Sequence, residues 1–178
     1  MAGRERLRLF CALRLPDLVL DELERWGQVE LAERIVSRAN LHVTVAFLGH
    51  RPSGELAGIV DATRAAAAGA AVPIRLEPVR YRETRSVGML VLDDEEGRAG
   101  AFALDLFERL EAIGVYERER REWLPHVTVV RFRERPRLSP PLPELGAFGP
   151  SDAAVYHSLL RPGGAQYTVL EAVALGGR

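Results

Sequence analysis

The chain has 178 residues, of which 47% are apolar and 28% are charged, values typical of a water-soluble globular protein. Its formal net charge is −1, so no overall basic field indicates a nucleic-acid-binding protein, and all 24 basic residues are arginine. The absence of lysine excludes a P-loop lysine, a Schiff base and a lysine–nucleotide intermediate, and with them an ATP-consuming ligase that is adenylated on lysine.

The number of cysteines and the lengths of the apolar runs exclude further kinds of site and segment. Cys11 is the only cysteine, so a disulfide within the chain and a four-cysteine zinc site are excluded. No stretch reaches about 18 consecutive apolar residues, and the charged start lacks an apolar signal core. We expect a cytoplasmic monomer that contacts no membrane and uses neither a metal nor another cofactor.

The first half of the chain predicts an alternation of strands and helices. An apolar run over 7–13 favours a strand, and helix-spaced apolar residues over 17–27 favour a helix that ends at its glycine. A short strand is expected at 35–36 and a clear strand over 42–48, where glycine and turn residues follow. A helix over 53–68 completes this half.

The second half repeats this kind of pattern. Strands are expected over 74–76, 87–92, 126–132, 153–160 and 167–175, with a helix over 100–113. Short strands that alternate with helices favour the α+β class over a doubly wound parallel sheet. No linker is long enough to separate independent domains, so we expect one domain over 1–178.

The tetrapeptide His-Val-Thr-Val occurs twice, at 42–45 (the first motif) and at 126–129 (the second motif). The chain has only four histidines and five threonines, and the two motifs use two of each. Each copy begins a predicted strand after a helix-containing unit. This spacing suggests that one unit was duplicated and that the copies are related by an approximate two-fold axis.

The geometry of a strand gives the repeat a chemical meaning. Side chains at i and i+2 point to the same face, so His42 projects with Thr44, and His126 projects with Thr128. Two such strands side by side present two imidazoles and two hydroxyls to one cleft. The intervening residues of the first strand are expected to point into a core: Val43, Val45 and Phe47.

Two histidines and two threonines suit the opening of a cyclic phosphodiester by water. One imidazole takes a proton from water and the other gives a proton to the leaving oxygen, because the histidine pKa of about 6.5 suits both roles. Threonine hydroxyls donate hydrogen bonds to the non-bridging oxygens and hold the phosphate. A histidine that starts a strand is alternatively a half-buried polar residue without function. Two histidines alone are too few for a zinc site.

The sequence resembles the 2H phosphoesterase superfamily, which is named for two His-x-Thr-x motifs. Within it, the chain is most similar to the RNA 2′,3′-cyclic phosphodiesterases of bacteria and archaea, also described as 2′-5′ RNA ligases. The segments that carry the resemblance are 8–13, 40–49, 125–131 and 158–165, together with Tyr167.

The resemblance implies two pseudo-symmetric lobes, each an antiparallel sheet with outer helices, around a central cleft. It implies hydrolysis of a 2′,3′-cyclic phosphate to a terminal 2′-phosphate, with His42 as proton donor and His126 as proton acceptor. The substrate would be an RNA end, such as that of a tRNA fragment, or a cyclic nucleotide. The two motifs are identical, so the residues themselves do not assign the two roles.

Two residues after the second motif are further candidates for substrate binding. Arg131 matches phosphate geometry, but its odd position places it on the opposite face of a regular strand from Thr128. Phe132 has the right parity to stack on a base, although its residue type favours core packing over this role. The arginines around the second motif form either a solvated charged face or a rim that guides RNA.

Three other functions remain open at this point. The same site run backwards joins RNA ends through a 2′-5′ bond, and a related site hydrolyses a small cyclic nucleotide such as ADP-ribose cyclic phosphate. A non-catalytic module that binds RNA or a nucleotide on the same scaffold is the alternative from another class of protein.

Overall fold

The computed structural model describes residues 5–31 and 34–177, which form a sheet of seven strands and three α-helices. In chain order these elements are β1 (Arg6–Arg14), α1 (Asp17–Glu30), β2 (Val43–Pro52), α2 (Leu56–Ala68), β3 (Leu76–Glu83), β4 (Val87–Asp94), α3 (Arg98–Ala112), β5 (His126–Arg131), β6 (Asp152–Arg161) and β7 (Gly164–Val173).

The strands form one antiparallel sheet in the order β3-β4-β5-β2-β1-β6-β7. Strands β2 and β5, which carry the two motifs, are neighbours and pair at Val43 and Val127. Three strands therefore lie on one side of this junction and four on the other. The expected α+β class, with an antiparallel sheet and outer helices, is confirmed.

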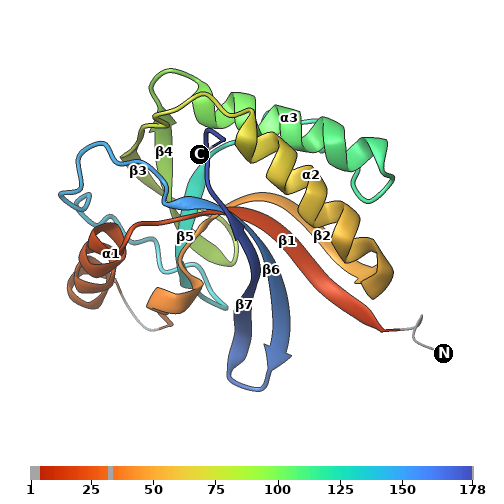
Figure 1. Cartoon of the computed structure of the whole chain (residues 1–178). Helices are drawn as coiled ribbons and strands as arrows, with labels where there is room; N and C mark the ends of the chain where they lie inside the picture. The colour runs from red at the N-terminus through yellow and green to blue at the C-terminus, as the bar shows by residue number, and fades with distance from the viewer. Residues whose placement is uncertain (1–4, 32–33, 178) are drawn as a thin grey trace.

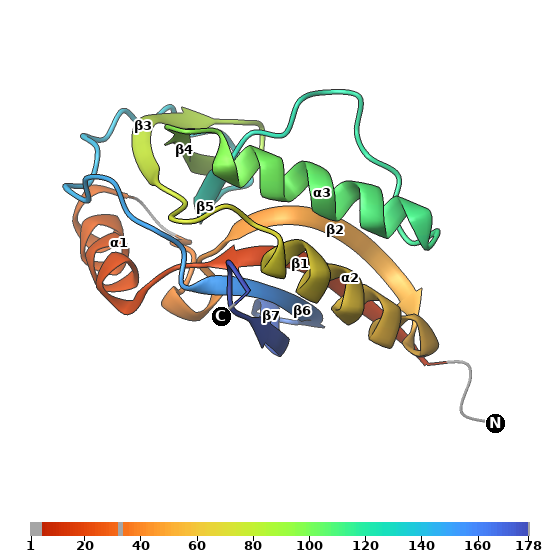
Figure 2. The same ribbon diagram turned by 45° about the horizontal axis from the view of Figure 1, so that its top comes forward.

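The helices cover one face of the curled sheet. Helices α2 and α3 lie side by side on it, and α1 lies apart at one end (Figures 1 and 2). Alternation along β1 separates the faces, because Leu9, Cys11 and Leu13 pack into the main core, whereas Phe10 and Ala12 belong to a small cluster on the other side. The helix-free face is therefore available for a site.

Three of the boundaries that were predicted wrongly have a physical reason. Helix α1 continues past Gly27 to Glu30; this glycine is buried, and Ile35 packs 3.1 Å from the position that a Cβ would take, so it permits close packing and does not end the helix. Strand β2 continues to Pro52, since Gly49 adopts a φ of +70° within the strand and accommodates an irregularity instead of ending the pairing. The strand expected at 74–76 lies at 76–83, where the charged residues of an edge strand obscure the apolar pattern.

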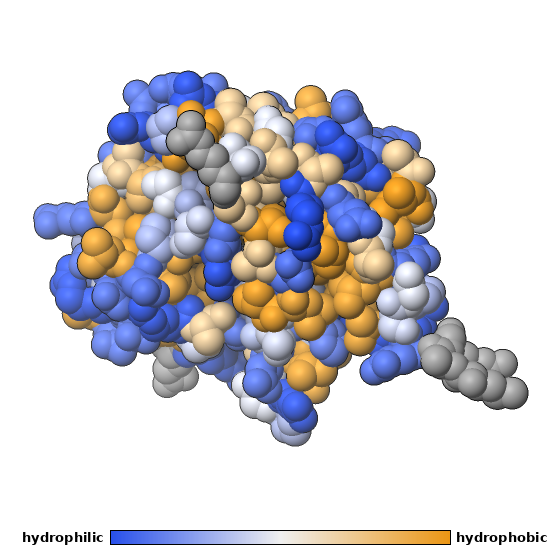
Figure 3. All heavy atoms as spheres, in the orientation of Figure 1, coloured by the Kyte–Doolittle hydropathy of each residue, from blue (hydrophilic) through white to orange (hydrophobic). Residues whose placement is uncertain are grey.

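The described part of the chain contains no helix that is both long enough and apolar enough to cross a membrane. On the face shown in Figure 3, hydrophobic residues gather in the middle and hydrophilic residues surround them. Single exposed apolar side chains such as Leu18 and Leu160 are ordinary on a protein surface.

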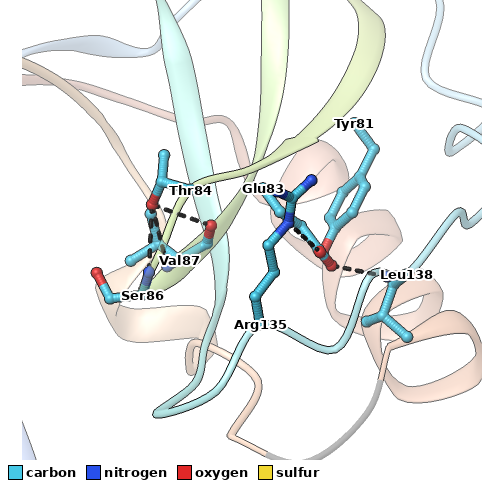
Figure 4. Close-up of polar contacts among 7 residues, drawn as sticks. All are labelled: Tyr81, Glu83, Thr84, Ser86, Val87, Arg135 and Leu138. Atoms are coloured by element: carbon cyan, nitrogen blue, oxygen red, sulfur yellow. Dashed lines mark hydrogen bonds and ion pairs between the residues drawn. The ribbon is translucent and has the colours of Figure 1, made fainter.

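A buried carboxylate connects the edge of the sheet to the proline-rich loop (Figure 4). The hydroxyl of Tyr81 donates to Glu83 at 2.8 Å, the amide of Leu138 donates to it at 2.9 Å, and Arg135 lies 3.3 Å away. Tyr81 reaches Glu83 across Gly88, where an added Cβ would lie 2.3 Å from the tyrosine oxygen. The Glu83 side chain is only 2% exposed, so these contacts replace its hydration.

We expect Glu83→Gln to lower the free energy of unfolding by about 1–3 kcal/mol at pH 7, since the hydrogen bonds lose their charged acceptor. Burial raises the pKa of Glu83, but the bonds from Tyr81, Leu138 and Arg135 more than offset this and leave it below its ordinary value. The stabilisation is therefore present above the pKa of an unfolded glutamate and is lost as the pH falls through the lower folded value.

Urea unfolding at pH 7 and in acid measures this difference. The matched control is Glu77→Gln, which removes the same charge from an exposed position of β3. Equal effects of the two substitutions at pH 7 would contradict the role of Glu83.

Candidate active site

The helix-free face contains a cavity of about 200 Å³ where the two motif strands meet. Five strands and the segment that leads into β2 supply its walls. The lining residues are Arg8, Phe10, Val36, Asn40, His42, Thr44, Phe47, Thr128, Arg131, Ser158 and Tyr167.

The pairing of β2 with β5 brings the two motifs together. Because Val43 lies opposite Val127, the antiparallel register places Thr44 beside His126 and His42 beside Thr128. Three of these four side chains line the cavity. His126 lies on the same strand as Thr128 but is not among the lining residues.

A bulge in β5 determines which residue after the second motif reaches the cavity. Thr128 pairs with Met89 and Val130 pairs with Gly88, so Val129 is an extra residue in β5. One extra residue inverts the alternation of faces beyond it. Arg131 therefore lines the cavity, against the prediction from its parity, and Phe132 packs against the main core instead of joining the site.

Strand β2 has the same irregularity at the equivalent position. Thr44 pairs with Ala12 and Ala46 pairs with Cys11, so Val45 is the extra residue. Val45 stays buried, but Phe47 turns to the cavity and is 49% exposed, which corrects its predicted place in the core. Phe47 and Arg131 thus occupy corresponding positions, each five residues after the histidine of its motif.

Both motif histidines are oriented by a backbone carbonyl two residues earlier. The Nδ1 of His42 lies 2.7 Å from the oxygen of Asn40, and the Nδ1 of His126 lies 2.8 Å from the oxygen of Leu124. A carbonyl only accepts hydrogen bonds, so Nδ1 carries the proton in each ring. In neutral His42 the Nε2 atom is then an acceptor, and the hydroxyl of Thr44 donates to it at 2.7 Å.

An aromatic cluster surrounds the imidazole of His42. The ring centroids of Phe10, Tyr156 and Tyr167 lie 4.9, 5.7 and 5.4 Å from that of His42. Phe10 and Tyr156 are stacked on each other at 4.8 Å, so the cluster is packed without the histidine as well. These rings exclude water from one side of the imidazole.

Burial lowers the pKa of His42 to about 4. The Asn40 carbonyl opposes this shift by accepting a bond from the ring, whereas the positive charges of His126 and Arg131 lower the pKa further. In the protein without substrate, His42 is therefore neutral near pH 7 and its Nε2 is unprotonated.

Two arginines face the cavity, and none of the residues that the structure describes adds a carboxylate to its lining. Arg131 lies 3.4 Å from the hydroxyl of Tyr167, and Arg8 donates to the hydroxyl of Ser158 at 2.9 Å. The guanidinium of Arg8 also lies 4.8 Å from the centre of the Phe47 ring. The lining charges are thus positive, which favours an anionic ligand.

Sequence reasoning did not identify Arg8, Phe10, Ser158 and Tyr167 as site residues. Arg8 and Phe10 are two residues apart on β1, so their side chains point to the same face of the strand. An arginine on the same face as an aromatic residue was the available sequence signal for a binding site. The contribution of β6 and β7 depends on strand order, which no local pattern contains.

Two further contacts hold the motifs in place. The Asn40 side-chain amide donates to the Ala165 carbonyl at 2.8 Å and connects the first motif to β7. The Trp123 indole donates to the Thr44 carbonyl at 3.1 Å, beside the bulge in β2. Over residues 5–31 and 34–177, no group of three histidine, cysteine, aspartate or glutamate side chains is arranged to hold a metal ion.

Comparisons with known proteins agree over nearly the whole chain. The family described as the 2′-5′ RNA ligase superfamily matches residues 15–158. An RNA 2′,3′-cyclic phosphodiesterase of Methanocaldococcus jannaschii is 22% identical, over 93% of this chain and 99% of its own.

Solved structures show the same fold. The protein TT0787 of Thermus thermophilus superimposes with a TM-score of 0.76 at 29% identity, over 96% of this chain and 99% of its own. E. coli LigT complexed with 3′-AMP superimposes with a TM-score of 0.78 at 23% identity, over 96% of this chain and 99% of its own.

Proposed function

Because the chain belongs to the 2′-5′ RNA ligase superfamily, we propose that it hydrolyses RNA 2′,3′-cyclic phosphate ends to 2′-phosphate ends, with His42 and His126 as the acid–base pair. The observation that carries this proposal is the meeting of the two motifs at one cavity whose charged lining, over the described residues, is cationic. The name of the archaeal relative, an RNA 2′,3′-cyclic phosphodiesterase, supports the same substrate class.

In the proposed reaction, water attacks phosphorus in line with the departing O3′. His126 takes a proton from the water, and His42 gives a proton to O3′ through its Nε2 atom. The P–O3′ bond breaks, a new P–O bond forms to the water oxygen, and the products are a 2′-phosphate and a free 3′-hydroxyl. Because both Nδ1 atoms bond to backbone carbonyls, the Nε2 atoms make these transfers, and the Thr44 hydroxyl releases Nε2 of His42 when that atom takes up its proton.

The remaining polar side chains hold the phosphate. The hydroxyls of Thr44 and Thr128 donate to its non-bridging oxygens, and the guanidinium of Arg131 balances its charge. His42 has a pKa of about 4 without ligand, so it takes up its proton together with the anionic substrate, whose negative charge favours the imidazolium form. The nucleotide in the LigT complex, 3′-AMP, supports a site for a nucleoside phosphate in this fold.

The test is incubation of the purified protein with a short RNA that ends in a 2′,3′-cyclic phosphate, in excess EDTA and in Mg²⁺. We expect an RNA with a 2′-phosphate and a 3′-hydroxyl, at equal rates in the two conditions. Mass spectrometry after reaction in ¹⁸O-labelled water identifies the hydrolysed bond.

Each other outcome counts against a stated part of the proposal. A 3′-phosphate product would reverse the assignment of the leaving oxygen. A rate that depends on one divalent ion would remove the two-histidine mechanism. Joined RNA, formed when an RNA with a 5′-hydroxyl is added, would make ligation the reaction, and no product from any substrate would leave a binding function.

A further inference from the structure

Arg8 is a cation in the cavity that the proposed hydrolysis does not use. Among the residues that the structure describes, its hydrogen-bond partner is the hydroxyl of Ser158, at 2.9 Å. Arg14, on the same strand, instead places its Nε 2.7 Å from the Asp152 carboxylate. Arg8 therefore retains most of its five donors and its full charge for a ligand.

The neighbours of Arg8 hold it in position for such a ligand. Its guanidinium packs over the ring of Phe47 at 4.8 Å and bonds to Ser158 at one end. Ser158 is buried, at 4% exposure, and lines the same cavity. Because its oxygen accepts the bond from Arg8, its own O–H remains available as a donor to a cavity ligand.

The charges of the cavity exceed those of one cyclic phosphate. Such a phosphodiester carries a single negative charge, and Arg131 balances it beside the two motifs. Arg8 adds a second positive charge on the other side of the first motif strand, since β1 and β5 flank β2. A buried or half-buried cation without a carboxylate is stabilised when a second anion binds.

The chemistry of the substrate identifies where that anion lies. On a ribose whose O2′ and O3′ are closed by phosphate, O5′ is the remaining oxygen that carries a phosphate in nucleotides. We propose that Arg8 and Ser158 bind the phosphate on the 5′ side of the nucleoside that carries the cyclic phosphate. This inference rests on the proposed function and extends it from the reacting cyclic phosphate to the phosphate on the 5′ side of the same nucleoside.

A 5′-side phosphate has two sources, the internucleotide link of RNA and the free 5′-phosphate of a small nucleotide. Three substrates separate them: adenosine 2′,3′-cyclic phosphate, its 5′-phosphorylated form, and the dinucleotide ApA with a terminal cyclic phosphate. The measured quantity is kcat/KM at fixed ionic strength, expressed as the ratio to adenosine 2′,3′-cyclic phosphate.

We expect Arg8→Met to reduce this ratio about ten- to a hundredfold, since a hydrogen-bonded charge on an anion is lost while the side chain still covers Phe47. Arg8→Lys should retain part of the ratio, because it keeps the charge without the planar fork. The matched control is Arg6→Met, which removes the same charge two residues earlier on β1, outside the cavity. It should leave the ratio as in the wild type.

The kcat/KM ratios of the three substrates identify the source of the 5′-side phosphate and test the proposal. A reduced ratio for the dinucleotide supports RNA, and one confined to the 5′-phosphorylated mononucleotide supports a small nucleotide. An equal loss on all three substrates leaves the ratio unchanged; it would place Arg8 at the cyclic phosphate and overturn the subsite. No loss on any substrate would overturn it as well. Equilibrium binding of the same ligands reports the ratio without turnover, so absent hydrolysis overturns the proposed reaction while an absent Arg8-dependent ratio overturns the subsite.

Discussion

Replacing His42 or His126 by alanine is expected to lower the rate of cyclic phosphate hydrolysis by about 10²–10⁴-fold, the usual contribution of a positioned general acid or base. Each imidazole has its Nδ1 committed to a backbone carbonyl and its Nε2 available for proton transfer. Alanine removes the proton carrier but keeps the strand. The expected loss therefore appears in kcat, measured under single-turnover conditions with saturating protein.

The two remaining histidines provide matched controls. His50 and His157 lie on β2 and β6, outside the cavity, so His50→Ala and His157→Ala should retain wild-type rates. Thermal melts of all four variants exclude loss of folding as the cause. A motif variant that keeps most of its activity while folded would remove that histidine from the mechanism.

The affinity for a cyclic phosphate is expected to rise as the pH falls, by about ten- to a thousandfold over the titration of His42. Without ligand, burial holds the pKa of His42 at about 4. An anion within a few ångströms raises such a pKa by about 1–3 units. The complex then binds more protons than the free protein, so by linkage its affinity increases towards acid.

The measurement uses His126→Ala, in which the expected slower turnover allows substrate binding to be measured. Titration calorimetry with adenosine 2′,3′-cyclic phosphate is run between pH 8 and 4.5, a range in which this ligand keeps one charge. NMR gives the pKa of His42 in the same variant with and without ligand. The control is the double variant with His42→Ala, whose affinity should be independent of pH. A flat profile in His126→Ala would show that His42 stays neutral in the complex.

The alternation rule was sufficient for the motifs themselves. His42 and Thr44 share a face, because side-chain direction follows residue parity in a regular strand, whereas Thr128 and Arg131 share one only through the bulge between them. The rule failed at Phe47, since the extra residue at 45 shifts the parity of the strand up to the next irregularity, between Phe47 and Gly49. Valine at 45 and 129 favours regular and bulged strands alike, so the bulges have no local signal.

Strand order limited the rest of the prediction. The hairpin of β6 and β7 was expected from its residues, and its two strands begin and end near the predicted positions. Its pairing with β1, which brings Ser158 and Tyr167 to the cavity, depends on contacts between distant segments. The sequence shows a charged residue, Arg8, within the predicted first strand. Only the fold shows that its side chain lies on the helix-free face of the sheet.

The inserted residues at 45 and 129 make the two halves of the site differ in the side chains that they present to the cavity. O2′ and O3′ of a ribose are adjacent and chemically alike, so two identical motifs would accept the cyclic phosphate in either sense. Each insertion turns a side chain beyond the motif to the cavity: the ring of Phe47 in one half and the guanidinium of Arg131 in the other. On the proposed function, we expect these two side chains to contribute to the choice of the oxygen that departs, although neither transfers a proton.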